Sequence, residues 1–315
     1  MFKKKVLFIC SYNKISGKGH LTRCLNLADK FKKKGYEYYF LKLKENIKIN
    51  GVKILNKKKV SKLNNFEFTI IDNYHFKNTK IKELKLKTKL VYFDDFGNNN
   101  FLDPYAIING SPNIKKSSYK NSENKTKLLL GLKYQITNIN KTYYTKKRKF
   151  MLLSFGFLDE KNLIPKFINW LDRIKFKKKI LIVVSKKTKN FKKILTLEKK
   201  SSHIKILSNL DNLDNIYKKC YFSIGAGGIM SFERIFYRIP SILVSTDGNQ
   251  INNIDYIKKN KLGYFLGKYN KIDFYKFNKI FFNFINKKNL TKIFNNCKKF
   301  TVYDSASNIF NKLIK

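Results

Sequence analysis

The feature that most constrains the fold is a pattern that occurs once in each half of the chain: a short apolar run, a polar loop with glycine, and an amphipathic helix. In the first half the apolar run is 6–10, and apolar residues then recur at helical spacing from Leu21 to Phe31. In the second half the run 150–155 leads into a turn at Gly156. Alternation of strands and helices is typical of a parallel sheet with crossover helices.

Further short apolar runs indicate that each half builds a whole sheet. The expected strands are 38–43, 68–71, 90–93 and 106–108 in the first half, and 179–184, 204–207, 221–224 and 241–244 in the second. The stretch 138–149 has no apolar period and is typical of a linker or a charged surface loop. The tail from Asp273 to Lys315 is expected to be mostly helical.

The predicted fold class is α/β, with two doubly wound, Rossmann-like domains that face each other across a cleft. We expect an N-terminal domain at 1–140, a C-terminal domain at 150–300, and a helix at 301–315 that packs back on the first domain. A length of 315 residues suits two domains of ordinary size. In this architecture a ligand binds at the carboxyl ends of the strands.

The charge is extreme, with 68 Lys and Arg against 21 Asp and Glu, a net +47. Such a charge suits a polyanion-binding protein. However, only five of these cations are Arg, and the Lys residues are spread along the whole chain beside abundant Asn, Ile, Phe and Tyr. A/T-rich codons explain that composition as well, so we expect no nucleic-acid partner and keep polyanion binding as the less favoured alternative.

Four separated cysteines form no CxxC pair, which argues against a zinc cluster or a disulfide framework. Reducing cytoplasm is the compartment that fits them best. The apolar runs are too short for a signal peptide or a membrane span. The oligomeric state stays open.

Two glycine-containing loops stand at strand-to-helix junctions. In the first, Gly17 and Gly19 precede His20, where backbone N–H groups favour an anion and an imidazole can take a proton near neutral pH. In the second, Gly227 and Gly228 precede a helix and offer backbone N–H groups to a diphosphate. A plain glycine turn with a capping histidine explains the first loop equally well.

Three other places carry candidate ligand contacts. Glu233, about one turn into the second helix, suits ribose hydroxyls or a nearby cation. The amides of Asn249 and Gln250 suit sugar hydroxyls, although Asp and Asn here are also typical of a turn and helix cap. Asp72, in the segment 72–74, and the pair Asp94 and Asp95 follow expected strands, and such acids suit a metal, a general base or helix capping.

Taken together, these segments resemble the UDP-sugar hydrolases of pseudaminic acid biosynthesis, which act on UDP-2,4-diacetamido-2,4,6-trideoxy-β-L-altropyranose. GKGHLTRCLNLA is similar to the GxGHxxRCxxLA motif of that family, and IIDNY, SIGAGGIMSFER, RIPSIL and NQ follow in the family's order. The resemblance covers roughly 4–267. The GAGG…SxxER…NQ series is shared with the wider class of GT-B glycosyltransferases.

The resemblance implies a GT-B fold, UDP held mainly by the C-terminal domain, and hydrolysis with inversion that needs neither cofactor nor metal. His20 falls on the family's catalytic histidine and Tyr74 on its tyrosine near the sugar. Glu233 falls on the ribose-binding acid and Asn162 in the loop that faces the diphosphate. The sugar contacts fall on Asn249 and Gln250, and the loop glycines on Gly17, Gly19, Gly227 and Gly228.

The chain departs from the family in two places. SFGGSD becomes SFGFLD, which puts Phe157 in place of a glycine, and GAGGSTSWER becomes GAGGIMSFER, which introduces Ile229 and Met230. The predicted function is hydrolysis of the UDP-linked sugar in nonulosonic acid biosynthesis. The alternative is a GT-B glycosyltransferase that uses a UDP-sugar donor.

Overall fold

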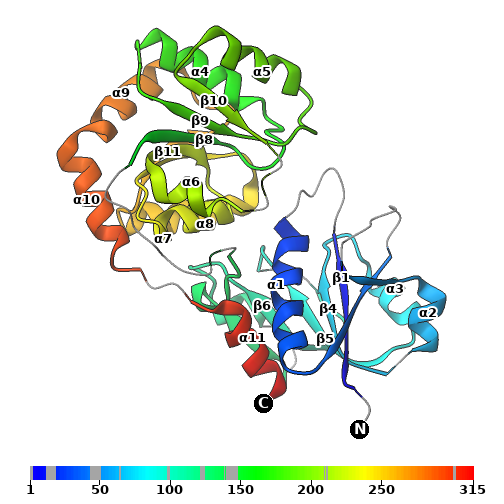
Figure 1. Ribbon diagram of the computed structural model, residues 1–315. Helices are drawn as coiled ribbons and strands as arrows, with labels where there is room; N and C mark the ends of the chain where they lie inside the picture. The colour runs from blue at the N-terminus through cyan, green and yellow to red at the C-terminus, as the bar shows by residue number, and fades with distance from the viewer. Residues whose placement is uncertain are drawn as a thin grey trace. The chain divides into compact units, whose positions relative to one another are not determined.

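The computed structural model describes residues 3–11, 19–42, 51–63, 65–97, 100–120, 125–137, 139, 148–208, 210, 212–300 and 303–315. Gly17 and most of the expected linker lie outside these residues. The chain divides into two compact units (Figure 1), an N-terminal unit of Met1–Asn138 with Tyr303–Lys315 and a C-terminal unit of Ile139–Val302.

The sheet of the N-terminal unit has seven parallel strands in the order β3-β2-β1-β4-β5-β6-β7. The strands are β1 (Lys5–Cys10), β2 (Glu37–Leu41), β3 (Lys53–Leu55), β4 (Asn65–Asp72), β5 (Lys87–Phe93), β6 (Pro104–Asn109) and β7 (Lys127–Leu130). The helices are α1 (Gly19–Lys33), α2 (Lys57–Lys62), α3 (Asn78–Glu83) and α11 (Ser305–Ile314), with 3-10 turns η1 (Lys116–Tyr119) and η2 (Leu132–Tyr134).

Helix α1 forms where the sequence predicts it, because its apolar residues share one face. Leu21, Cys24, Leu27 and Phe31 are all buried on that face. The helix ends before Gly35, whose φ of 85° places it in the left-handed region that only glycine adopts at low cost. The glycine therefore allows the chain to turn from α1 into β2.

The two faces of this sheet carry separate cores. On one face α1 and α11 lie side by side (Figure 1), and Ile309, Phe310 and Leu313 of α11 are buried in the same cluster as α1. On the other face α2 and α3 contribute Val60 and Ile81 to the second cluster. Helices on both faces make the unit doubly wound.

The strand order of the N-terminal unit reverses between β1 and β4, which lie side by side with Cys10 opposite Asp72. The connection after β1 leads to α1 on one face, and the chain that follows β4 leads to α3 on the other. Such a switch point leaves a crevice at the carboxyl ends of the strands, where ligands of open α/β sheets bind.

The C-terminal unit has six parallel strands in the order β10-β9-β8-β11-β12-β13, with its switch point between β8 and β11. The strands are β8 (Phe150–Ser154), β9 (Ile180–Val183), β10 (Ile204–Leu207), β11 (Cys220–Ala226), β12 (Ser241–Ser245) and β13 (Tyr264–Lys268). Its helices are α4 (Leu163–Arg173), α5 (Phe191–Lys200), α6 (Asp214–Lys219), α7 (Ile229–Phe236), α8 (Ile251–Lys259), α9 (Phe274–Ile285) and α10 (Lys287–Cys297), with a 3-10 turn η3 (Gly248–Gln250).

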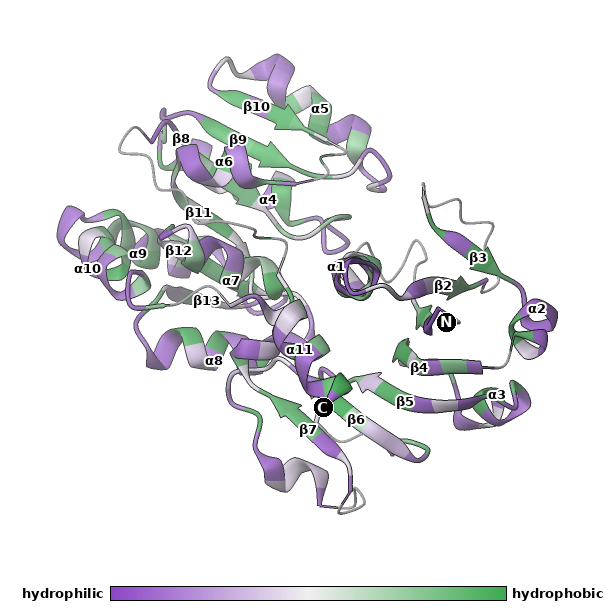
Figure 2. Ribbon diagram, turned by 60° about the horizontal axis from the view of Figure 1, so that its bottom comes forward, coloured by the Kyte–Doolittle hydropathy of each residue, from purple (hydrophilic) through white to green (hydrophobic). Residues whose placement is uncertain are grey.

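Hydropathy follows this architecture. The strands of the C-terminal unit are largely apolar, whereas its surface helices alternate apolar and polar residues (Figure 2). Trp170 on α4 is buried and stacks on Phe277 of α9, with ring centroids 5.3 Å apart, so it belongs to the core of this unit. No helix in the described part of the chain combines the length and the apolar character that a bilayer crossing needs.

Three strands were not expected from the sequence, namely β3, β7 and β13. They have three, four and five residues. They lie at the outer positions of their sheets, where pairing with an already formed neighbour is sufficient to define a strand.

Candidate functional site

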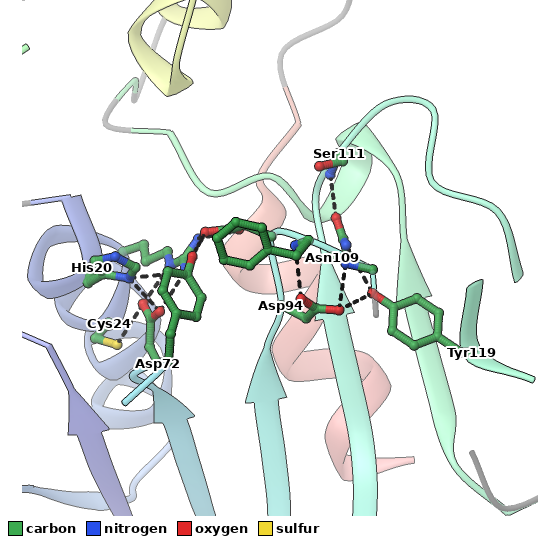
Figure 3. Close-up of polar contacts among 12 residues, drawn as sticks. His20, Cys24, Asp72, Asp94, Asn109, Ser111 and Tyr119 are labelled. Atoms are coloured by element: carbon green, nitrogen blue, oxygen red, sulfur yellow. Dashed lines mark hydrogen bonds and ion pairs between the residues drawn. The ribbon is translucent and has the colours of Figure 1, made fainter. Parts of the chain in front are cut away.

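The candidate catalytic group of the N-terminal unit is a His–Asp pair at the switch point (Figure 3). His20 lies in the first turn of α1, and Asp72 is the last residue of β4. The His20 Nδ1 lies 2.6 Å from the Asp72 Oδ1. The imidazole keeps 15% of its side-chain surface exposed, whereas the carboxylate is fully buried. This arrangement fixes the ring while leaving it accessible.

The tautomer of His20 follows from its neighbours. The Arg23 Nη2 also lies 3.2 Å from the His20 Nδ1, but both nitrogens are donors if Nδ1 carries the proton. The shorter contact is to the carboxylate, which accepts only, so we assign the Nδ1 proton to the bond with Asp72. The lone pair of the neutral ring is then on Nε2, where a general base needs it.

Arg23 joins this pair to a second carboxylate. It lies one helical turn after His20, is 4% exposed, and its Nε donates to the Asp72 Oδ2 at 2.5 Å. Its Nη2 donates to the Asp72 Oδ1, and its Nη1 donates to the Asp95 Oδ1 at 2.8 Å. The guanidinium also lies over the Phe93 ring, 4.6 Å from the centroid. Arg23 therefore bridges the ends of β4 and β5.

This bridge keeps Asp72 ionised although it is buried. Burial by itself would raise the pKa of Asp72, but the charge and hydrogen bonds of Arg23, with His20, lower the pKa to about 2. Burial likewise opposes the charge of Arg23, yet Asp72 and Asp95 raise the pKa of the guanidinium well above its usual value. The Cys24 Sγ, 3.6 Å from the Asp72 Oδ2, is a third neighbour of the carboxylate.

Tyr74 completes the group at its exposed edge. Its hydroxyl donates to the Asp95 Oδ2, and its ring meets the His20 ring edge-on with centroids 5.1 Å apart. Burial and the charge of Asp95 raise the pKa of the phenol, so it stays protonated at all ordinary pH values. The structure thus brings together His20 and Tyr74, which the sequence predicted as site residues of this half. Gly19, also predicted, is the first residue of α1.

Asp94 has a different role from its neighbour. Its carboxylate accepts from the N–H groups of Phe96 and Gly97, both at 2.9 Å, and from the Tyr119 hydroxyl at 2.7 Å. Asn109 donates to the same hydroxyl (Figure 3). This network holds the turn after β5, as the capping interpretation of the acidic pair predicts. Among described residues no group of three or more His, Cys, Asp or Glu side chains is placed to hold a metal.

In the C-terminal unit, Gly227 and Gly228 lie between β11 and α7, beside the switch point. Gly228 is the N-cap residue of α7 and, as a glycine, offers no side chain to cap the helix. A Cβ on Gly227 would lie 2.4 Å from the Ile254 Cγ1 of α8, whereas one on Gly228 would have no neighbour closer than the Gln250 Nε2 at 3.8 Å. Gly227 is therefore required for packing, and Gly228 leaves open space at the helix N-terminus.

Replacing these two glycines separates the roles. We expect Gly227→Ala to destabilise the C-terminal unit by about 1–3 kcal/mol, because the methyl group collides with a buried isoleucine. Gly228→Ala is the matched control and should change stability much less. Urea unfolding monitored by fluorescence of Trp170, the one tryptophan of the chain, measures both. Equal stabilities of the two variants would contradict the packing role of Gly227.

Glu233 is buried beside another aromatic hydroxyl. The Tyr217 Oη donates to the Glu233 Oε2 at 2.9 Å. Arg234, next in sequence, is fully buried, and its Nη2 donates to the Ala226 carbonyl at 2.6 Å. Burial lowers the pKa of Arg234, and the nearby Tyr217 and Glu233 oppose that shift. Tyr217 is therefore a described hydrogen-bond partner of Glu233, whereas Arg234 donates to a backbone carbonyl.

The amide pair after β12 is partly engaged within its own loop. The Gln250 Oε1 accepts from the Thr246 N–H at 3.0 Å, and the Gln250 Nε2 donates to the Thr246 Oγ1 at 2.8 Å. Asp247 caps η3, and its Oδ1 accepts from the Asn249 N–H at 3.4 Å. Gln250 therefore shapes the turn, and the half-buried Asn249 has the more available side chain.

Asn162 precedes α4 in the left-handed region, with φ of 51°, and its exposed Oδ1 accepts from the Asn190 Nδ2 at 3.1 Å. The residue that binds the N-terminus of α4 is instead Asp159, whose two oxygens accept from the N–H groups of Leu163 and Ile164 at 2.9 Å. Burial raises the pKa of Asp159 to about 6, although these two hydrogen bonds oppose the shift.

This raised pKa gives a pH-dependent stability of known sign. The folded carboxyl binds its proton more tightly than the unfolded one, whose pKa is about 3.9, so its contribution is complete below about pH 4 and is lost as pH rises through 6. We expect the stability of the wild type minus that of Asp159→Asn to fall by roughly 2–3 kcal/mol from pH 4 to pH 7. Urea unfolding monitored by Trp170 fluorescence measures it. A difference that does not change with pH would show that Asp159 titrates alike in both states.

The sequence did not predict that Arg23 and Asp95 belong to the site as partners. A signal was present: Arg23 follows His20 by three residues, on the face of the amphipathic helix that carries Leu27 and Phe31. A charged residue on a buried face requires a partner, and acids end two strands of the same sheet. Asp95 is indistinguishable from Asp94 in sequence.

Comparison with known proteins gives a whole-chain match in structure and a weaker one in sequence. An uncharacterized protein of Methanocaldococcus jannaschii is 28% identical over 284 residues, which cover 81% of this chain. The chain spans only 58% of the length of that relative. No protein-family model matches the chain.

Solved structures match over nearly the full length. MurG of Acinetobacter baumannii superposes with a TM-score of 0.72 at 11% identity, over 99% of both chains. A glycosyltransferase from Rickettsia africae gives 0.65 at 12% identity, and UDP-GlcNAc 2-epimerase from Methanocaldococcus jannaschii gives 0.60 at 12% identity, each over 99% of both chains. With two doubly wound parallel sheets and these similarities, the chain has the GT-B fold predicted from its sequence.

Proposed function

We propose that this protein is an enzyme that acts on a UDP-sugar and breaks the bond between the anomeric carbon and the diphosphate, with His20 as general base. The observation that carries the proposal is the His20 Nδ1 held 2.6 Å from a buried, ionised Asp72 at the carboxyl edge of a parallel sheet. Similar structures include a glycosyltransferase and an epimerase whose name contains UDP-GlcNAc, which supports the substrate class.

In the proposed reaction the His20 Nε2 takes the proton of an incoming hydroxyl group as its oxygen attacks C1. The C1–O bond to the diphosphate breaks, UDP leaves with that electron pair, and the configuration at C1 inverts. Asp72 stabilises the imidazolium that forms, as the aspartate of a catalytic triad does. No covalent enzyme intermediate is needed.

The roles proposed for the C-terminal unit rest on the sequence resemblance and on the chemistry of the loops. The open backbone around Gly228 and the N-terminus of α7 suit the diphosphate. Glu233 would bind the ribose, Asn249 and Gln250 the sugar, and Asn162 the region of the phosphates.

Two incoming hydroxyl groups fit this chemistry. The similar solved structures favour the hydroxyl of an acceptor, that is glycosyl transfer, and we take this as the leading proposal. Hydrolysis, in which the hydroxyl is water, is the second. It is favoured by the GKGHLTRC segment, because the structure joins His20 and Arg23 of that motif through Asp72. The 2,4-diacetamido sugar and nonulosonic acid biosynthesis belong to this second proposal.

The experiment measures UDP release by the purified protein with EDTA present, first from UDP-GlcNAc and from the UDP-linked 2,4-diacetamido-trideoxy-altrose without acceptor. The reactions are then repeated with methyl glycosides as acceptors. Glycosyl transfer predicts release that depends on the glycoside, and hydrolysis predicts full turnover in water alone. Absence of both release and UDP binding would contradict a UDP-sugar enzyme.

A further inference from the structure

A pocket of about 260 Å³ opens in the N-terminal unit next to Tyr74. It lies where the ends of β4 and β5 meet the start of α3, with Asn100 and Phe101 also in its lining. The described residues that line it all belong to the N-terminal unit. Among the described residues that line it, Tyr74 is the one that the proposed function already names.

The floor of the pocket is apolar and largely aromatic. Ile71, Phe76, Tyr92 and Phe93 line it, and each is no more than 9% exposed. The Tyr92 hydroxyl donates to the Leu102 carbonyl at 2.8 Å, so its polar end is already bonded and its ring is what remains to contact a ligand. Such a floor favours the apolar face of a small ring.

The rim is polar and carries mainly amides. Asn73, Asn78 and Asn100 line it together with Lys77, and none of the lining residues that the structure describes is a carboxylate. The Asn73 Oδ1 accepts from the His75 N–H at 3.0 Å, and the Asn78 Nδ2 donates to the Asn100 carbonyl at 3.4 Å. Side-chain amides both donate and accept, which matches hydroxyl groups.

Tyr74 connects this pocket to the candidate general base. Its ring lines the pocket and also meets the His20 ring edge-on at 5.1 Å, while its hydroxyl is held by Asp95. A molecule in the pocket therefore lies one aromatic ring from the imidazole. Proton transfer needs hydrogen-bond contact with the imidazole, so the hydroxyl that reacts must extend from the pocket past the Tyr74 ring to His20.

We infer that this pocket binds the acceptor of the proposed glycosyl transfer, a neutral, hydroxyl-bearing ring of about the size of one sugar. The inference rests on the proposed function and names the class of its second substrate. The volume lies just under the ~300–1,000 Å³ of drug-sized ligand sites, which excludes a lipid chain or an oligosaccharide as the enclosed part. A nucleotide site needs a glycine-rich loop for the phosphates, whereas the described lining of this pocket offers them Lys77 alone.

The first test measures binding of methyl β-glucopyranoside and methyl N-acetyl-β-glucosaminide by saturation-transfer NMR. Asn100→Trp should place an indole at the pocket rim and weaken binding at least tenfold. Lys80→Trp, on an exposed residue of α3 outside the pocket lining, is the matched control and should bind like the wild type. Unchanged binding in Asn100→Trp, or no binding of either glycoside to the wild type, would overturn the inference.

A second variant guards against misfolding of the first. Asn78→Asp keeps the size of the side chain and places an acid in the first turn of α3, which favours the helix, but it removes the amide donors. We expect a threefold or larger loss of glycoside affinity with an unchanged melting temperature. A variant that binds both glycosides as tightly as the wild type would contradict the role of the amide rim.

These outcomes are separable from failure of the proposed function. If UDP is released in water, His20→Ala abolishes release and the glycosides do not bind, the acceptor pocket is wrong and the UDP-sugar chemistry stands. If the glycosides bind, Asn100→Trp blocks them and no UDP-sugar is turned over or bound, the proposed donor is wrong and the pocket stands as a carbohydrate site.

Discussion

Replacing His20 by alanine should reduce kcat for UDP release by about 10²–10⁴-fold, because the incoming hydroxyl then loses the group that takes its proton. UDP binding should stay close to that of the wild type, since the imidazole acts on the hydroxyl and not on the nucleotide. Steady-state UDP release together with calorimetric titration of UDP separates these two effects.

Asp72→Asn is the informative companion of His20→Ala. Its amide is nearly the same size but does not hold the Nδ1 proton as a carboxylate does, so the proportion of the productive tautomer falls. A loss of kcat in Asp72→Asn with His20 intact would support orientation of the ring by Asp72. Full turnover in His20→Ala would contradict its assignment as general base.

The second large effect concerns folding. Arg23→Met should destabilise the N-terminal unit by about 3–5 kcal/mol, because it leaves the fully buried Asp72 without its main cationic partner. Hydrogen exchange of the β1 and β4 amides measures this loss. Trp170 lies in the other unit and its fluorescence serves as an internal reference. Lys33→Met, which removes an exposed pair with Asp29, is the control for loss of a cation and should not change exchange.

The pH dependence of the same variant has a defined sign. In the wild type the pKa of Asp72 is lowered to about 2, so its stabilisation is present above the unfolded value of about 3.9 and is lost as pH falls toward 2. Without Arg23, burial dominates and raises the pKa, so Arg23→Met should gain stability relative to the wild type on acidification. Parallel pH profiles would contradict the role of Arg23 as the partner that keeps Asp72 ionised.

The fold was predictable because it depends on patterns that repeat locally. Strands such as β1, β8 and β10 are short apolar runs flanked by polar turns, and α1 shows its buried face in the spacing of Leu21, Cys24 and Phe31. Burial of an apolar face is decided by spacing alone. Strands β3 and β7, at the two edges of the N-terminal sheet, were not predicted.

The candidate site was predictable only in part. His20 and Tyr74 came from a motif and a resemblance, and the structure places their rings in contact. The sequence left the acids at the ends of β4 and β5 open between metal binding, base catalysis and capping. In the structure Asp72 and Asp95 accept hydrogen bonds from Arg23, whereas Asp94 accepts from the backbone of its own turn.

The sequence by itself determined two doubly wound halves, the glycine turns between strand and helix, and the position of His20 at a helix start. Only the tertiary structure decided that Arg23 pairs with Asp72, 49 residues away, and that Asp95 but not Asp94 completes the bridge. The physical reason is that local spacing decides which face of an element is buried. Strand order and register, here β1 beside β4 and β4 beside β5, decide which side chains meet at the sheet edge.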